Sequence, residues 1–429
     1  MGVALDARRA NAHVSFRMTH ETDVAVIGAG AGGVAAARRL TDARVPVVLL
    51  EARGRIGGRA WTCRAGDLAL DLGCGWLHSA DESELAALAP GLGFPVDSSP
   101  PPWSRPAFNG NFSAAEQKDY WAAWERFYAR VDAAAEGGSD APMSDCFEPG
   151  CRWNAMLGAM ITYINGAEAE KISVREYALY HDSGVNKRVQ RGYGALIEAY
   201  AAGIDVRLNC PVTLIDHSGA RLRIVTPRGE LLARAAIVAV PPGLMANESL
   251  CFSPALPDRL AAAQLPLGVA DKVFLRVDRA DDLPSDTRLA GATTTRETGS
   301  YTLRPFGRPV IEGYFGGAFA RTLEHEGDGA FAAFAIEQIC AALGSDMRQR
   351  LCPITESAWA RDPFALGSYS YGNPGAHAMR AKLAAPVDGR LFFAGEHTSP
   401  ADFSTAHGAY RTGVKAAEAA ITALQVAPV

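Results

Sequence analysis

One stretch near the start of the chain, residues 23–59, constrains the fold more than any other. Residues 23–27 form a short apolar run typical of a buried strand, and a glycine-rich turn after it opens an alanine-rich segment of helical type that runs to about Ala43. A second apolar run, residues 45–50, ends at Glu51. This order predicts a βαβ unit of the doubly wound α/β type.

The turn inside this unit carries the spacing G-x-G-x-x-G at Gly28, Gly30 and Gly33, with Gly32 between the last two. The first glycine permits a tight turn, the second lets backbone approach a pyrophosphate, and the third lets helix and strand pack closely. Unpaired N–H groups at the helix start suit phosphates. Glu51, 21 residues after Gly30, lies where a carboxylate can accept hydrogen bonds from a ribose diol. The pattern predicts a dinucleotide site and not an ordinary tight turn.

The residues after Glu51 indicate which dinucleotide is bound. They run through Arg53 and Arg55 to Gly57-Gly58-Arg59 and resemble the E-x-R-x-R-x-G-G-R extension of FAD-binding oxidases of the glutathione-reductase-like type. Guanidinium groups bind phosphate oxygens bidentately, so arginines just past the ribose site suit a pyrophosphate. We therefore expect FAD as cofactor, with Arg53 and Arg59 in its site.

Composition excludes several classes of protein. A net charge of −5 gives no electrostatic footprint for nucleic acid, and no apolar run approaches the length of a membrane span. The eight cysteines form no C-x-x-C pair, which favours reduced cytoplasmic thiols and gives no support for a metal site. Residues 1–21 contain no apolar segment of signal type, so we expect them to form a disordered N-terminal arm of a cytoplasmic protein. We expect this protein to be a monomer or a homodimer.

Residues 69–79, ALDLGCGWLHS, give the first specific family signal. They resemble the segment that passes the flavin ring in the flavin-containing amine oxidase family, which includes monoamine and polyamine oxidases and lysine-specific histone demethylases. The resemblance places Gly75 and Trp76 against the flavin and implies that His78 lines the active site. The family's usual Gly-Asn-Pro after this point is absent, so the local loop differs.

Lys272 lies in residues 265–277, LPLGVADKVFLRV, which alternate as a strand. From alternation alone, Lys272 would be an ordinary solvent-facing residue. The family carries a lysine in a matching strand whose ammonium holds a water at flavin N5. The resemblance therefore implies a catalytic role for Lys272.

The last 70 residues carry the densest resemblance. Residues 359–371 match the family's W-x-x-D-P-(F/W)-x-x-G-S-Y-S-Y, with Ser368 where covalent members place cysteine, which implies FAD bound non-covalently. Tyr369 matches the first wall of an aromatic cage, and Tyr410 is either its second wall or a core tyrosine of the last helix. The same resemblance assigns cofactor contacts, of different kinds, to Val212, Trp359, Glu396, Thr405 and Ala406.

These signals predict an α/β fold in which a glutathione-reductase-like FAD-binding Rossmann domain is interleaved with a substrate domain of antiparallel sheet plus helices. We assign residues 22–86, 187–262 and 360–429 to the first domain, and residues 87–186 and 263–359 to the second. In the second, residues 113–136 show an aromatic stripe at helical spacing, which we expect to pack in the core.

The implied reaction is FAD-dependent amine oxidation, with hydride transfer from the α-carbon of a primary or secondary amine to flavin N5, imine hydrolysis, and reoxidation by O2 to hydrogen peroxide. His78 favours a diamine or polyamine, whereas monoamines remain open. An L-amino acid would need an arginine for its carboxylate, and the 36 arginines leave that open too. The alternatives are a desaturase or porphyrinogen-type oxidoreductase, or a non-catalytic flavin-binding protein.

Overall fold

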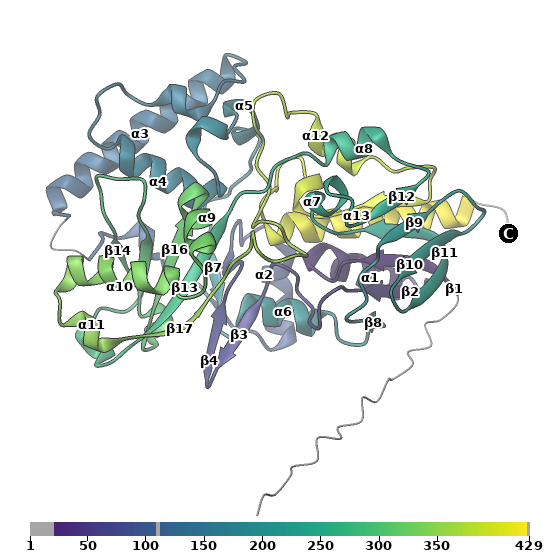
Figure 1. Cartoon of the computed structure of the whole chain (residues 1–429), viewed down its shortest axis with the longest axis horizontal. Helices are drawn as coiled ribbons and strands as arrows, with labels where there is room; N and C mark the ends of the chain where they lie inside the picture. The colour runs from purple at the N-terminus through teal and green to yellow at the C-terminus, as the bar shows by residue number, and fades with distance from the viewer. Residues whose placement is uncertain (1–20, 109–111, 427–429) are drawn as a thin grey trace, which may run out of the picture.

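The computed structural model describes residues 21–108 and 112–426, and its two main sheets lie in two lobes (Figure 1). The expected disordered arm, residues 1–21, falls outside the described residues except for Glu21, which begins the first strand. The predicted βαβ unit is confirmed. It consists of β1 (Glu21–Ile27), α1 (Ala31–Asp42) and β2 (Val47–Leu50), with β1 and β2 parallel.

This unit belongs to an eight-stranded sheet in which β1 lies between β2 and β11 (Gly229–Val238), parallel to both. Segments far apart in the sequence therefore meet in one sheet. Its remaining strands are β8 (Val206–Arg207), β9 (Leu214–Asp216), β10 (Leu222–Thr226), β12 (Cys251–Ser253) and β18 (Leu391–Phe393).

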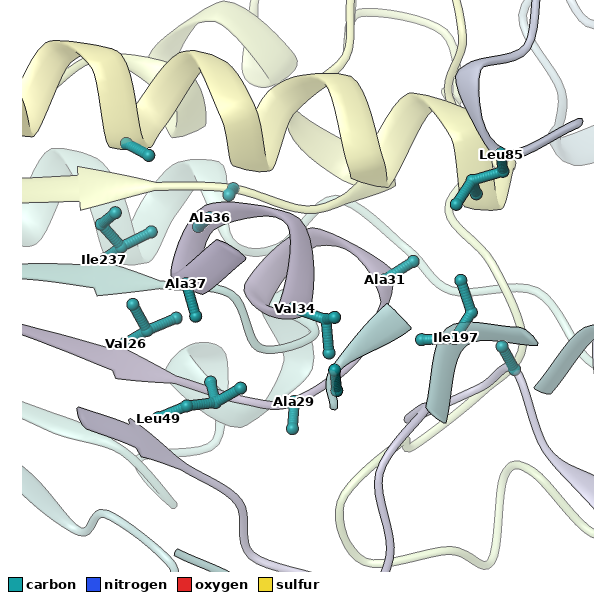
Figure 2. Close-up of a cluster of buried hydrophobic side chains, with 14 of the residues drawn as sticks. Val26, Ala29, Ala31, Val34, Ala36, Ala37, Leu49, Leu85, Ile197 and Ile237 are labelled. Atoms are coloured by element: carbon teal, nitrogen blue, oxygen red, sulfur yellow. The ribbon is translucent and has the colours of Figure 1, made fainter. Parts of the chain in front are cut away.

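Helix α1 and α13 (Ala406–Val426), the long C-terminal helix, lie side by side, and both pack on this sheet. Figure 2 shows Val26, Leu49 and Ile237, from three neighbouring strands, next to Ala36 and Ala37 of α1. The small residues of α1 let the layers approach closely. A Cβ at Gly33 would lie 1.8 Å from the carbonyl oxygen of Gly28, and one at Gly413 would lie 2.0 Å from that of Gly32. Only glycine fits at these two crossings.

The second lobe is built on a five-stranded antiparallel sheet, as the sequence predicts. One face packs on α10 (Ala330–Leu343) and α9 (Gly317–Glu326) through Val273, Phe315 and Phe331. In order, the strands are β14 (Thr287–Ala290), β15 (Ser300–Leu303), β16 (Val310–Gly316), β13 (Ala270–Val277) and β17 (Leu351–Glu356).

Helices α3 (Ala114–Glu136), α4 (Asn154–Asn165) and α5 (Val174–Tyr177) complete this lobe. Ser113 caps α3 in a reciprocal capping box with Glu116. The expected core packing of the α3 stripe is confirmed: Tyr120 is buried, and Trp121 and Trp124 pack against the same cluster while also lining a cavity. Both tryptophan side chains are half-buried.

Small elements join the two lobes. The hairpin of β3 (Thr62–Ala65) and β4 (Leu68–Asp71) is followed by a three-stranded sheet of β5 (Trp76–Leu77), β7 (Lys187–Val189) and β6 (Val96–Asp97). Within residues 21–108 and 112–426, none of the helices has both the length and the apolarity that crossing a bilayer requires. The same residues contain no cluster of potential metal ligands, and none of the eight cysteines, all of which lie within them, forms a disulfide.

Candidate functional site

A cavity of about 1110 Å³ lies between the two lobes. It extends from the glycine-rich turn after β1 to the face of the five-stranded sheet that α10 does not cover. Sixteen of the residues singled out in the sequence line it: Gly28, Gly30, Gly32, Glu51, Arg53, Arg59, Gly75, Trp76, His78, Val212, Lys272, Trp359, Tyr369, Glu396, Thr405 and Ala406. Gly33 and Tyr410 do not.

The glycine-rich turn supplies an open patch of backbone at one end of the cavity. Gly30 is the N-terminal cap residue of α1, and the nearest atom to a Cβ placed there would be 3.9 Å away, so the backbone is reachable from the cavity. Gly33 lies behind this patch, where it allows α1 to touch the turn. The arrangement fits a pyrophosphate at the N-terminus of a helix.

Glu51 follows β2 at the same end of the cavity and is 3% exposed. Its Oε2 accepts a hydrogen bond from the backbone N–H of Ala29 at 2.7 Å, and its Oε1 accepts one from the N–H of Arg53 at 2.9 Å. These bonds fix the carboxylate against the turn while each oxygen keeps a lone pair. The orientation fits acceptance of hydrogen bonds from a ribose diol.

The two arginines of the FAD motif line the cavity but already have protein partners. Arg53 pairs with Asp362 at 2.5 Å, and Arg59 Nη1 donates to Glu396 Oε1 at 2.9 Å and to the carbonyl of Ser368 at 2.6 Å. Burial acts to raise the pKa of Glu396, but Arg59 and other neighbours overcome it and lower that pKa to about 2. The arginines therefore organise the walls of the site in addition to any contact with phosphate.

The start of α13 forms another wall. Thr405 Oγ1 accepts a hydrogen bond from the N–H of Gly408 at 3.0 Å, which makes Thr405 the cap of this helix. Ala406 follows it at the cavity surface, with the positive end of a helix of 21 residues behind it. With the glycine turn and Glu51, this wall gives the cavity backbone donors at two helix ends, as an anionic dinucleotide such as FAD requires.

Lys272 projects from β13 into the middle of the cavity and is 6% exposed. Its Nζ lies 2.9 Å from Glu312 Oε1, and a Cβ placed on Gly75 would lie 3.0 Å from Nζ. Burial acts to lower the pKa of Lys272, but the carboxylates of Glu312 and Asp71 outweigh it and raise that pKa. Lys272 is a buried, charged residue, so the solvent-facing alternative is wrong.

A set of tyrosines surrounds Lys272. Tyr369 donates its hydroxyl hydrogen bond to the carbonyl of Tyr163 at 2.8 Å, and its oxygen lies 3.1 Å from that of Tyr314. Tyr314 is also the strand partner of Lys272. Sequence reasoning missed Glu312 and Tyr314. The two residues are two positions apart, so they lie on the same face of their strand. That they share this face with Lys272 can be known only once the strand register is known.

Of the two expectations for Tyr410, the structure supports the core tyrosine and not the second wall of the cage. Its hydroxyl lies 3.2 Å from that of Tyr200, and the two rings pack with centroids 5.8 Å apart, away from the cavity. At that point of α13, Ala406 and Ala409 face the cavity, and Tyr410 is turned toward α6 (Tyr193–Tyr200). Tyr410 is thus the core tyrosine of the alternative reading. The aromatic residues that share the cavity with Tyr369 include Tyr163, Tyr180, Tyr314 and Phe403.

His78 lies at the cavity surface, where its Nδ1 is 2.5 Å from Asn186 Oδ1. Burial lowers the pKa of His78, which favours a neutral ring. The exposed carboxylate of Asp182 lines the same part of the cavity. This rim combines a neutral imidazole with an acidic side chain.

Comparison with known proteins agrees with this geometry. The family model described as flavin containing amine oxidoreductase matches residues 31–165 and 148–421. Polyamine oxidase 2 of Arabidopsis thaliana is 32% identical over 455 residues, covering 96% of this chain and 91% of that protein. Human lysine-specific histone demethylase 2 is 24% identical, and its match covers 93% of this chain and 53% of the demethylase.

Solved structures show the same fold. A double mutant of putrescine oxidase superposes with a TM-score of 0.75 at 20% identity, covering 94% of this chain and 99% of that one. Cyclohexylamine oxidase from Brevibacterium oxydans gives a TM-score of 0.73 with the same identity and coverage. The family match begins at the first residue of α1 and extends over most of the length of this chain, including the start of α13. The chain therefore belongs to the family of flavin-containing amine oxidoreductases and is an FAD-dependent enzyme that oxidises amines.

Proposed function

We propose that the chain is an oxidase of a primary or secondary amine, either a diamine or polyamine or a monoamine, and that the cavity between the lobes holds both FAD and the amine. The observation that carries this proposal is the position of Lys272. A buried ammonium paired with Glu312 adjoins Gly75 and the tyrosines, in the same cavity as the glycine-rich turn.

In this proposal, Gly28, Gly30, Glu51 and the start of α13 hold the cofactor without a covalent bond. Ser368 at the matching position has no thiol, and its hydroxyl donates to the carbonyl of Ala270 at 2.9 Å. When bound, FAD would accept a hydride equivalent from the α-carbon of the amine and then pass two electrons to O2, which is reduced to hydrogen peroxide. The imine product is hydrolysed by water to a carbonyl compound and the released amine or ammonia.

The side chains around Lys272 position the amine and the water. The rings of Tyr314 and Tyr369 form an apolar wall that excludes bulk water and favours the neutral, reactive form of the amine. Lys272, kept charged by Glu312, holds a water molecule for imine hydrolysis and provides positive charge where oxygen is reduced. His78 at the rim orients the distal part of the substrate.

We also propose that the lobes correspond to the two interleaved domains. All strands of the eight-stranded sheet fall in residues 22–86, 187–262 and 360–429, apart from the first residue of β1, and all strands of the five-stranded sheet fall in residues 263–359. Eight cysteines without a disulfide suit the reducing cytoplasm, where we expect a monomer or homodimer.

The test is an anaerobic absorbance titration of the purified flavoprotein with putrescine, spermidine, phenethylamine and a mixture of L-amino acids. We expect at least one class of amine to bleach the visible band of oxidised flavin and to give hydrogen peroxide when air is admitted. If dithionite bleaches the band and every amine leaves it unchanged, the proposal is wrong.

A further inference from the structure

We infer that Arg288 forms a carboxylate-binding subsite at the end of the cavity remote from Lys272, so that the enzyme acts on amines that carry a carboxylate some distance from the reacting carbon. This inference rests on the proposed oxidase function and specifies its substrate class. It begins from one buried cation that nothing in the cavity neutralises.

Arg288 lies on β14, at the edge of the five-stranded sheet, and lines the cavity. In the strand register it is opposite Thr302, and Thr302 is opposite Glu312. All three line the cavity, so they form a row across its floor. The far end of this row is next to Lys272, which holds Glu312.

Four arginines are buried in the described part of the chain, and three of them have partners for their side chains. Arg188 pairs with Asp97 and Asp286, Arg259 donates to backbone carbonyls, and Arg380 pairs with Glu176. Arg288 is only 8% exposed, yet no side chain or carbonyl within residues 21–108 and 112–426 accepts from its guanidinium, and its Nε is buried without a partner.

A buried cation without a counter-charge is costly, and buried charges are ordinarily paired. The neighbouring acidic groups do not serve, because Glu312 is engaged with Lys272 and the aromatic neighbours Tyr120 and Tyr163 are phenols whose pKa values burial raises. A guanidinium presents paired donors that match a carboxylate. The missing partner is therefore an anion delivered with the substrate.

The position of Arg288 sets the shape of that substrate. Strands β14 and β13 are three strand spacings apart in the sheet, or about 14 Å between backbones. In an α-amino acid the amine and the carboxylate share one carbon, which is a poor match for this separation. The distance favours an ω-amino acid or another amine with a carboxylate beyond a flexible spacer.

The experiment compares three matched series of substrates, each from propyl to octyl length: ω-aminoalkanoates, alkylamines and α,ω-diamines. Flavin reduction is followed in the holoenzyme, in Arg288→Gln and in Arg288→Lys. For at least one chain length, we expect the wild-type flavin to be reduced more efficiently by the aminoalkanoate than by the diamine, with a kcat/KM about tenfold higher. Arg288→Gln should remove this preference. Arg288→Lys should keep part of it, because lysine retains the positive charge but lacks the paired N–H donors of the guanidinium.

The alkylamines are the control for folding and chemistry, because they have no group for Arg288 to bind. We expect Arg288→Gln to leave their kcat/KM within about twofold. A wild-type preference for diamines at every length, or equal losses for alkylamines and aminoalkanoates in Arg288→Gln, would overturn the inference while leaving the oxidase function intact. Failure of all three series to bleach the flavin would instead contradict the proposed function itself.

Discussion

At the scale of single residues, the pair of Lys272 and Glu312 determines the charge at the centre of the cavity. Burial on both faces of β13 favours loss of the lysine proton, and the carboxylate 2.9 Å away opposes that loss. The protonation of Lys272 depends on Glu312 more than on any other neighbour, because Glu312 is the strongest of the groups that raise the pKa of Lys272.

Replacing Glu312 by glutamine should therefore lower the pKa of Lys272, since burial remains and its main counterweight is removed. In the wild type, the ammonium stays charged to a pH above the ordinary lysine pKa. In Glu312→Gln, we expect the rate of flavin reoxidation by O2 to fall as pH rises from about 7 to about 10, where the wild-type rate stays level. Stopped-flow reoxidation of the reduced enzyme across that range measures it.

Glu326→Gln is the matched control, because Glu326 is exposed at the end of α9 and away from the cavity. Its pH profile should coincide with that of the wild type. Superimposable profiles for Glu312→Gln and the wild type would show that Glu312 does not set the charge of Lys272.

At the scale of elements, close contacts of backbone position α1 for its role. Gly33 brings the first turn of this helix onto Gly28, and Gly32 contacts α13 near Gly413. Both helices start at the cavity, so the crossing that requires glycine also directs two helix N-termini toward one ligand. The glycines thus act through packing as much as through the turn itself.

Gly33→Ala tests this packing. The new Cβ would lie 1.8 Å from a backbone oxygen, so α1 must move away from the turn, and we expect a loss of about 3 kcal/mol or more in the free energy of unfolding together with loss of bound FAD. Urea unfolding and the flavin-to-protein absorbance ratio report the two effects.

Gly91→Ala serves as the control, because a Cβ there meets no atom within 4 Å. Its stability should stay within about 0.5 kcal/mol of the wild type. If Gly33→Ala binds FAD with unchanged stability, the close contact between α1 and the turn is not required.

At the scale of the whole molecule, the cavity is formed by two lobes that the chain visits alternately. The eight-stranded sheet draws strands from three separate segments of the sequence, and the five-stranded sheet adds the opposite wall (Figure 1). A ligand that fills the space between them touches both lobes, so its binding should stabilise the folded molecule as a unit.

Removal of FAD should accordingly lower the unfolding temperature of the protein. With free FAD about a hundredfold above its Kd, the expected stabilisation is about 2.7 kcal/mol. Thermal unfolding of the apoprotein with and without added FAD measures this shift. FMN, which lacks the adenosine half that the Glu51 end of the cavity fits, should restore far less, and equal restoration by FMN would contradict the assignment of that end.

Local sequence determined the elements whose pattern is short-range. The βαβ unit and the helix over residues 113–136 follow from spacings of a few residues, and both are present. The family motifs likewise sufficed to identify FAD and amine chemistry, because they lie in short continuous segments.

Tertiary structure alone decided which side chains meet across those segments. Helical periodicity could not say whether Tyr410 faces the cavity or Tyr200, since that depends on how α13 is rotated against its neighbours. Strand alternation could not pair Lys272 with Glu312 or isolate Arg288, since strand order and register fix both. Spacing along a chain sets the face on which a residue lies, but its charge partner is set by which other element packs against that face.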